Sequence, residues 1–283
     1  MGLRHRYCLH ELLNYLKLPR STFYYHLKNS DREDRSKALK EEILSIYCEH
    51  NTYYGYRRIH LELRNRGWKC NKKAVQRIMQ QLGIKGKTCR KRVKYNSFRG
   101  QVGEVAPNLL NREFKADEPN LKWATDVTEF KTRGGKVYLS PIIDLFNQEV
   151  ISQDISTRPS FDQVERMLAD ALEVLEIEEG KSLLFHSDQG WQYQMKEFQD
   201  SLRSRGITQS MSRKATCLDN AIVENFFSIV KRELYYSEEA FNTPEELAFA
   251  LEDYIKYYNH RRIKVGLGGM SPIDYRLAHL GKG

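Results

Sequence analysis

Long apolar runs and paired cysteines are both missing from this sequence. No stretch of the 283 residues approaches the roughly 18 consecutive apolar residues that a membrane-spanning helix needs. The N-terminus is basic, but the apolar core of a signal peptide does not follow it. The five cysteines are odd in number and lack paired spacing, which argues against a disulfide frame or a zinc site: Cys8, Cys48, Cys70, Cys89 and Cys217. These absences predict a chain that stays in a reducing cytosol and off the membrane.

Charge is divided unevenly along the chain. Residues 1–115 hold 26 Lys and Arg against 10 Asp and Glu, a net charge of +16. Residues 116–283 hold 20 against 27, a net charge of −7. A basic front joined to a mildly acidic body is typical of a polyanion-binding part attached to a part that binds cations. A basic surface that is merely solvated is the alternative interpretation.

The front of the chain predicts two helical units and a connector. Residues 1–30 resemble a helix-turn-helix, whose second helix would turn Arg20, Ser21 and Thr22 towards a DNA major groove. Residues 37–84 predict a second unit of this kind. Its third helix, capped by Asn71, has apolar residues on one side and basic or amide groups on the other: Lys72, Lys73, Gln76 and Arg77. Such a face suits phosphate contact and base reading, although an ordinary solvated face looks the same.

Residues 85–120 have little periodicity and many basic side chains, which predicts an extended linker. Lys91 and Arg92 lie in its most basic stretch, where they would follow a DNA backbone. A solvated linker without DNA contacts is the alternative. Residues 236–283 predict a helical C-terminal extension, in which Arg261 and Arg262 would grip DNA or a neighbouring subunit.

Residues 121–235 predict an α/β body. The periodicity indicates strands at 122–130, 136–144, 149–156, 182–187 and 207–210, and helices at 160–176, 194–205 and 217–233. Three strands in succession, followed by alternating helices and strands, fit a mixed sheet with helices on both faces.

Three acids lie on these rigid elements. Asp126 is expected in the middle of the first strand and Asp188 at the end of the fourth, with Glu224 on one edge of the last helix. Asn220 and Lys231 share that edge as candidate DNA contacts. Buried carboxylates repel one another and are poorly solvated unless a cation neutralises them, and oxygen ligands suit Mg²⁺ or Mn²⁺. Asp144 is interpreted as structural. His186 would either orient water or phosphate, or be a hydrogen-bonded core histidine.

The residues around the acids form a recognisable pattern. It includes Trp123-x-x-Asp126-x-Thr128, His186-Ser-Asp188-Gln-Gly190 and Asp219-Asn-Ala-x-x-Glu224, with 35 residues between Asp188 and Glu224. From about residue 10 to residue 276 the chain resembles transposases of the insertion sequence three family, and its body resembles the catalytic core of retroviral integrases. The resemblance implies an RNase H-like fold whose first and fourth strands are neighbours. It also implies that this chain is the product of the downstream one of two reading frames.

The activity implied by this resemblance is that of a DDE-type transposase or integrase, a polynucleotidyl transferase. Asp126, Asp188 and Glu224 would be the catalytic acids and hold two Mg²⁺ or Mn²⁺ ions, Asp126 bridging both. The partners would be double-stranded DNA, which includes the terminal inverted repeats and the target, and the upstream reading-frame product. The chain would act on that DNA as a homo-oligomer. The place would be the bacterial cytoplasm, at the nucleoid.

Two other functions stay open on the sequence alone. A catalytically degenerate DNA-binding regulator of transposition would keep the basic units, and another RNase H-like nuclease would keep the core chemistry. The chain also has Arg261-Arg-Ile-Lys264 where many relatives have Arg-Pro-His. That departure does not touch the three acids.

Overall fold

The computed structural model describes residues 7–29, 36–87, 104–175, 182–214, 216–236 and 240–281. Backbone contacts divide the chain into two compact units, residues 1–45 and 46–283, and each is described by itself. None of the helices in the described ranges combines the length and apolarity that crossing a membrane requires. The linker residues Lys91 and Arg92 lie outside the described residues.

The described part of the first unit begins with two short helices. Helix α1 (Leu9–Tyr15) begins where the Glu11 carboxylate accepts a 3.2 Å bond from the Cys8 amide. It ends before Lys17, whose φ of 50° turns the chain towards α2 (Arg20–Asn29). The expected helix pair in residues 1–30 is therefore confirmed. Helix α3 (Lys37–Glu49) contains the boundary between the units.

Two further helices follow in the second unit, α4 (Tyr56–Asn65) and α5 (Lys72–Gln81). The Asn71 side chain accepts a 2.9 Å bond from the Lys73 amide, so the predicted cap of α5 is confirmed. The helix buries an apolar face made of Val75, Ile78 and Met79. Its polar residues are exposed, as the pattern predicts: Lys72, Lys73, Gln76 and Arg77.

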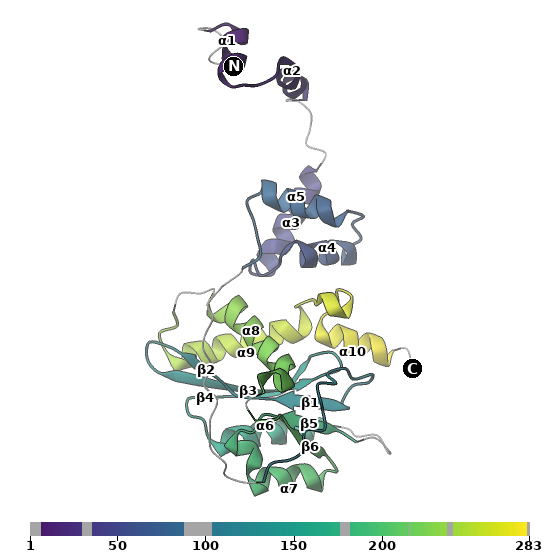
Figure 1. Ribbon diagram of the computed structural model, residues 1–283, viewed down its shortest axis with the longest axis vertical. Helices are drawn as coiled ribbons and strands as arrows, with labels where there is room; N and C mark the ends of the chain where they lie inside the picture. Colours follow the sequence, from purple (N-terminus) through teal and green to yellow (C-terminus); the bar gives the residue numbers. More distant parts are fainter. Residues whose placement is uncertain are drawn as a thin grey trace. The chain divides into compact units, whose positions relative to one another are not determined.

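A six-stranded mixed sheet forms the centre of the second unit (Figure 1). Strand β1 pairs antiparallel with β3 and parallel with β5, and β5 pairs parallel with β6. Strand β3 also pairs antiparallel with β2 and β4. The strands are β1 (Lys122–Thr125), β2 (Thr128–Lys131), β3 (Lys136–Asp144), β4 (Val150–Ser156), β5 (Leu184–Ser187) and β6 (Thr208–Met211). This is the mixed sheet that the sequence predicts.

The expected strand over residues 122–130 is wrong in one respect, because it is two strands with a break at Asp126 and Val127. Thr125 pairs with Ile142 and Thr128 with Leu139 in one continuous register, which sets Asp126 opposite Pro141. Proline has no amide hydrogen to donate to the ladder. Asp126 therefore follows a strand instead of lying inside one.

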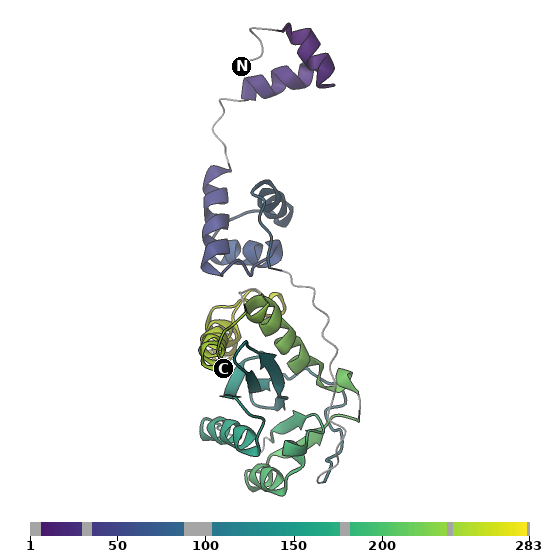
Figure 2. The same ribbon diagram turned by 90° about the vertical axis from the view of Figure 1, so that its left-hand side faces the viewer.

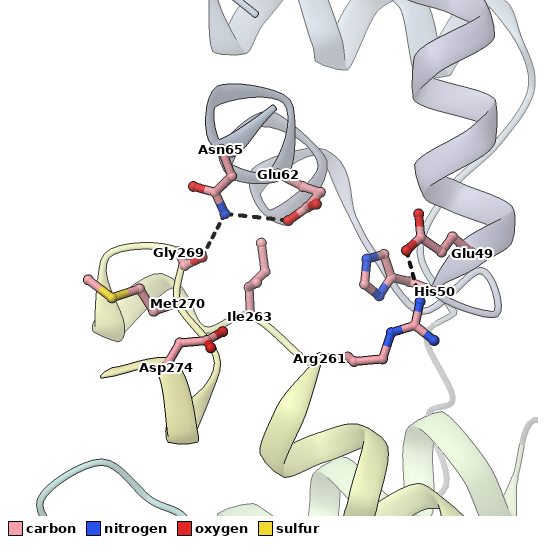
Figure 3. A pocket seen from close by; sticks show the side chains of 9 residues that line it. All are labelled: Glu49, His50, Glu62, Asn65, Arg261, Ile263, Gly269, Met270 and Asp274. Carbon is pink, nitrogen blue, oxygen red and sulfur yellow. Dashed lines mark hydrogen bonds and ion pairs between the residues drawn. The ribbon is translucent and has the colours of Figure 1, made fainter. Parts of the chain in front are cut away.

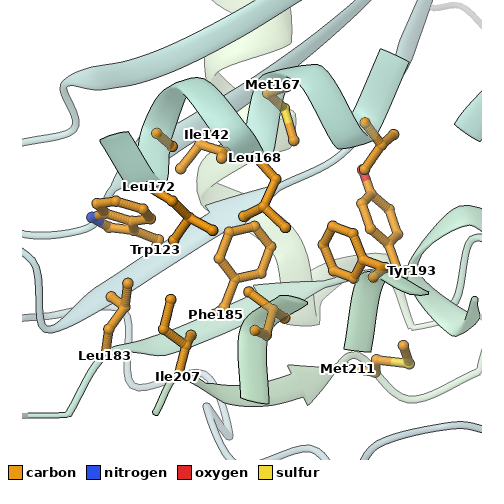
Figure 4. Close-up of a cluster of buried hydrophobic side chains, with 14 residues drawn as sticks. Trp123, Ile142, Met167, Leu168, Leu172, Leu183, Phe185, Tyr193, Ile207 and Met211 are labelled. Atoms are coloured by element: carbon orange, nitrogen blue, oxygen red, sulfur yellow. The ribbon is translucent and has the colours of Figure 1, made fainter. Parts of the chain in front are cut away.

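Helices cover both faces of the sheet (Figures 1 and 2). Helices α6 (Phe161–Glu173) and α7 (Lys196–Ser204) lie on one face. Helices α8 (Ala221–Val230) and α9 (Pro244–His260) lie on the other, followed by α10 (Pro272–Leu280). On the α6 and α7 side, Trp123 and Phe185 of the central strands meet apolar residues of both helices in a buried cluster (Figure 4). This packing holds β1 and β5 rigid.

The helix expected over residues 217–233 is a run of three helical types. A 3-10 turn (Cys217–Asn220) leads into α8, and a π-helical turn (Lys231–Tyr235) follows it. Ring packing of Phe226 against Tyr258, with centroids 4.9 Å apart, fixes α8 to α9. The run carries Glu224 across the end of β1.

Candidate active site

The three predicted acids come together at one edge of the sheet. Strands β1 and β5 run parallel with Ala124 opposite His186, so Asp126 and Asp188 follow two residues later on the same edge. Helix α8 packs near β1 and carries Glu224. The negative charges of both Asp188 and Glu224 act on Asp126. Acids 62 and 98 positions apart along the chain therefore share one electrostatic environment.

Asp126 lies at the centre of this environment. Loss of hydration raises its pKa well above the usual range, and the negative charges of Asp188 and Glu224 raise it further. One of its oxygens accepts a 2.7 Å bond from the Val127 amide, which offsets part of that effect. An acid held among other acids is stabilised by a bound cation.

The other two acids differ in their surroundings. Burial raises the pKa of Asp188, whose Oδ1 accepts a 2.8 Å bond from the Gly190 amide. Partial desolvation also raises the pKa of Glu224, but its side chain is exposed on α8. Within the described ranges, no group of three His, Cys, Asp or Glu side chains already has metal-ligand geometry. The donor set, three carboxylates of like charge, still fits a hard divalent cation.

Lys231 is a cation whose charge interacts with that of Asp126. Its ammonium donates a 2.7 Å bond to the Thr128 hydroxyl, lies 5.3 Å from the centre of the Phe130 ring and attracts Asp126. Burial lowers the pKa of Lys231, although the charge of Asp126 opposes that change. The predicted placement of Lys231 near the acid cluster agrees with these contacts.

Asn220 holds the start of α8 against β1. Its amide group donates a 3.0 Å bond to the Thr125 carbonyl, one residue before Asp126. The side chain is buried, so it does not lie on the exposed edge where the sequence pattern places it beside Glu224. Its Oδ1 has no hydrogen-bond partner among the described residues. The structure thus gives Asn220 a positioning contact.

His186 is a hydrogen-bonded core histidine, the second of its two interpretations. Its Nε2 lies 3.0 Å from the Asp219 carbonyl, which can only accept, so Nε2 carries the hydrogen. Its Nδ1 then accepts from the Ser210 hydroxyl at 2.9 Å. Burial lowers the pKa of His186 to about 4, which keeps the ring neutral. The histidine ties β5 to the turn that precedes α8.

The π-helical turn after α8 contributes Glu233 to a buried ion cluster. Glu233 accepts bonds of 2.7 and 2.8 Å from Arg262, one of 2.8 Å from Tyr254 and one of 3.0 Å from Arg58. Only 3% of Arg262 is exposed. The prediction that Arg262 contacts DNA at the surface is therefore wrong, because Arg262 is the buried counter-ion of Glu233.

Asp144 is structural, as predicted. It is fully buried and accepts 2.9 Å bonds from the Asn120 and Phe146 amides and a 2.6 Å bond from Arg276 of α10. It pairs with Trp123 at the start of β1, whereas Asp126 follows the end of that strand. Asp144 therefore belongs to the opposite edge of the sheet from the acids.

Arg261 lines a cavity of about 450 Å³ that contains none of the three acids (Figure 3). Its guanidinium donates a 2.8 Å bond to Glu49, and its side chain is about half exposed. The remaining DNA candidates lie on helix surfaces. Arg20 and Ser21 of α2 are exposed and Thr22 is half-buried.

Reasoning from the sequence did not find Thr125, Asp219, Arg112 or Arg213 as parts of this region. Asp219 stands next to Asn220, and its fully buried carboxylate accepts bonds from both arginines. Its place at the head of the motif around Glu224 is a signal that could have drawn attention to it. The two arginines carry no such signal, because Arg112 lies 107 positions from Asp219 and Arg213 lies in an irregular segment before it.

A mixed sheet between helices, with acids after β1 and β5 and on α8, defines an integrase-type core, the fold of polynucleotidyl transferases. Models of the integrase core domain match residues 116–217 and 224–280. In Escherichia coli (strain K12), the "Putative transposase InsK for insertion sequence element IS150" is 52% identical over 274 residues, 97% of this chain and 95% of that protein. This chain belongs to the insertion sequence three family of transposases.

A second transposase agrees with that membership. The transposase InsF for insertion sequence IS3A of Escherichia coli (strain K12) is 30% identical over 272 residues, 94% of this chain and 92% of that protein. The HTLV-2 integrase catalytic core domain in complex with magnesium aligns with 56% of this chain and 98% of its own, at 21% identity and a TM-score of 0.44. An HTH-like domain model matches residues 33–93, the region of α3, α4 and α5.

Proposed function

We propose that this transposase cleaves and joins DNA strands at the ends of its insertion sequence, with Asp126, Asp188 and Glu224 as the catalytic acids. The observation that carries the proposal is the environment of Asp126, where two further carboxylates from distant elements raise its pKa. Such convergence of like charge, at the loop end of two parallel strands, serves no purpose in stability. It serves cation binding.

The three acids would hold Mg²⁺ or Mn²⁺, two ions in all. When bound there, such ions would supply charge that favours deprotonation of the attacking water or 3′ hydroxyl and that stabilises the leaving oxygen. Asp126 and Asp188 are fixed by the Val127 and Gly190 amides. Glu224 lies on the exposed side of α8 and can approach them when DNA is present. Lys231 is suitably placed to contact a phosphate beside Asp126.

The other predicted DNA contacts belong to the same proposal. Exposed Lys72, Lys73, Gln76 and Arg77 of α5 would bind the terminal repeats through phosphates and base edges. Arg20, Ser21 and Thr22 of α2 would add a second contact, and Lys91, Arg92 and Arg261 would contribute charge. The acting species would be a homo-oligomer that assembles on the element ends and target DNA.

The test is cleavage of labelled duplexes that carry the DNA flanking the reading frame, with Mg²⁺ or Mn²⁺ and with chelator. Glu224→Gln should lower cleavage by roughly 100-fold or more, since outer-shell partners of metal ligands alone cost about 10- to 100-fold. DNA affinity should stay unchanged. The matched control is Glu165→Gln, an exposed helical glutamate on α6, which should cleave as the wild type does. Cleavage by Glu224→Gln at the wild-type rate would refute the assignment.

A further inference from the structure

Two arginines are fixed by one buried carboxylate at the start of α8. Asp219 Oδ1 accepts bonds of 2.7 Å from Arg112 Nε and 2.9 Å from Arg213 Nη2. Asp219 Oδ2 accepts bonds of 2.8 Å from Arg213 Nε and 2.9 Å from the Asn108 amide group. Two guanidinium groups share one carboxylate, so the group as a whole carries a positive charge.

Both arginines keep donors that face solvent. Their side chains are 45% and 54% exposed, whereas that of Asp219 is 0% exposed. Arg213 uses Nε and Nη2 on Asp219, and Arg112 uses Nε. The other guanidinium nitrogens have no partner within the described ranges. A guanidinium held in this way loses little side-chain entropy when it binds a second anion.

The pair is anchored, through Asp219, to the turn that precedes the helix of Glu224. The Asp219 carbonyl accepts from His186, and the next residue, Asn220, holds the Thr125 carbonyl beside Asp126. Any anion bound by the two arginines is therefore placed in a defined relation to the acid cluster. Carboxylate and phosphate are the anions that a planar, forked donor matches, and phosphate is the one that a DNA backbone supplies.

We infer that Arg112 and Arg213 form a preorganised receptor for one phosphodiester of the DNA strand that enters the acid cluster. Asp219 is the positioning residue that aims both guanidinium groups. The inference deepens the proposed function and rests on it, because it names where the backbone of the bound DNA is held.

The experiment measures DNA affinity of the full chain against salt concentration for wild type, Arg112→Gln and Arg213→Gln. Each lost phosphate contact should make the slope of log K against log salt shallower by about one. Cleavage should fall by at least 10-fold. Arg166→Gln is the control, since Arg166 binds Asp154 through Nε and Nη2 with a side chain that is 56% exposed. It should keep the wild-type slope.

Arg112→Gln leaves the two-point contact of Arg213 with Asp219 intact, so it tests the receptor even where Arg213→Gln unfolds. Comparing an element-end duplex with an unrelated duplex shows whether the phosphate belongs to the element or to target DNA. Wild-type slopes in both variants, with a wild type that binds and cleaves, overturn the receptor alone. A wild type that binds DNA without metal-dependent cleavage overturns the proposed activity, and the slopes still decide the receptor. A wild type that does not bind DNA overturns both.

Discussion

Arg58 of α4 donates a 3.0 Å bond to Glu233, which lies nine residues after Glu224 on the same helical run. Arg58 belongs to the HTH-like region, and Glu233 belongs to the integrase core. The bond is shielded from solvent, because the Glu233 side chain is only 2% exposed. The HTH-like region and the helical run that carries Glu224 thus share one ion cluster.

Replacing Glu233 should weaken the fold strongly. Glu233→Gln leaves Arg58 and Arg262 without their carboxylate, and breaking a buried pair typically costs about 3–5 kcal/mol. Urea unfolding measures the loss. Glu129→Gln removes the half-buried partner of the exposed Lys136 and should cost about 1 kcal/mol or less. Equal losses in the two variants would contradict the burial argument.

Removing the Asn220 contact should affect catalysis more than DNA binding. Asn220→Ala loses the bond to the Thr125 carbonyl and loosens the start of α8 relative to Asp126. Cleavage should fall by about 10- to 100-fold, and the Mg²⁺ concentration for half-maximal rate should rise. Asn225→Ala, at an exposed position of the same helix, should change neither quantity. An unchanged Mg²⁺ requirement in Asn220→Ala would mean that the contact does not position the acids.

Stability should decrease as the solution becomes acidic. The folded state holds the pKa of His186 at about 4, whereas the unfolded chain takes up this proton near pH 6.5. The free energy of unfolding therefore falls between pH 6.5 and pH 4, by up to about 1.4 kcal/mol per pH unit for this group. His186→Gln should reduce that slope, and His260→Gln, at an exposed histidine, should not. A slope that His186→Gln leaves unaltered would contradict a neutral buried ring.

Neutralising Asp126 should stabilise the metal-free protein. In chelator, Asp126→Asn removes repulsion with Asp188 and Glu224 and should raise the free energy of unfolding by roughly 1–2 kcal/mol. Added Mg²⁺ should raise the melting temperature of wild type, because an ion held by the three proposed ligands would bind only the folded state, and it should have little effect on the variant. Asp170→Asn on α6 is the exposed control. A variant that Mg²⁺ stabilises as much as wild type would remove Asp126 from the ligand set.

Local patterns in the sequence predicted much of this fold. The cap at Asn71, the full extent of β3 and the position of Asp188 directly after β5 all follow from neighbouring residues. The break at Asp126 can be explained by Pro141, which interrupts the ladder opposite it. This explanation requires the register of the two strands, which local patterns do not give.

Long-range contacts between individual side chains could not be predicted. Arg262 looks like a surface cation because its sequence neighbours are basic, yet its partner Glu233 lies 29 positions away. The amide of Asn220 turns inward because a carbonyl 95 positions earlier accepts from it. Such contacts depend on the assembled tertiary structure, so the pattern of neighbouring residues does not predict them.

The three acids are not the residues that hold β1, β5 and α8 together. Thr125, His186 and Asn220 join β1, β5 and α8 with uncharged bonds, and the acids are left out of that framework. If strand cleavage needs all three acids, a single altered codon yields an intact protein that occupies the element's ends without cutting them. Decay of one copy would then restrain its active siblings in the same cell, and mobility would fall as inactive copies accumulate.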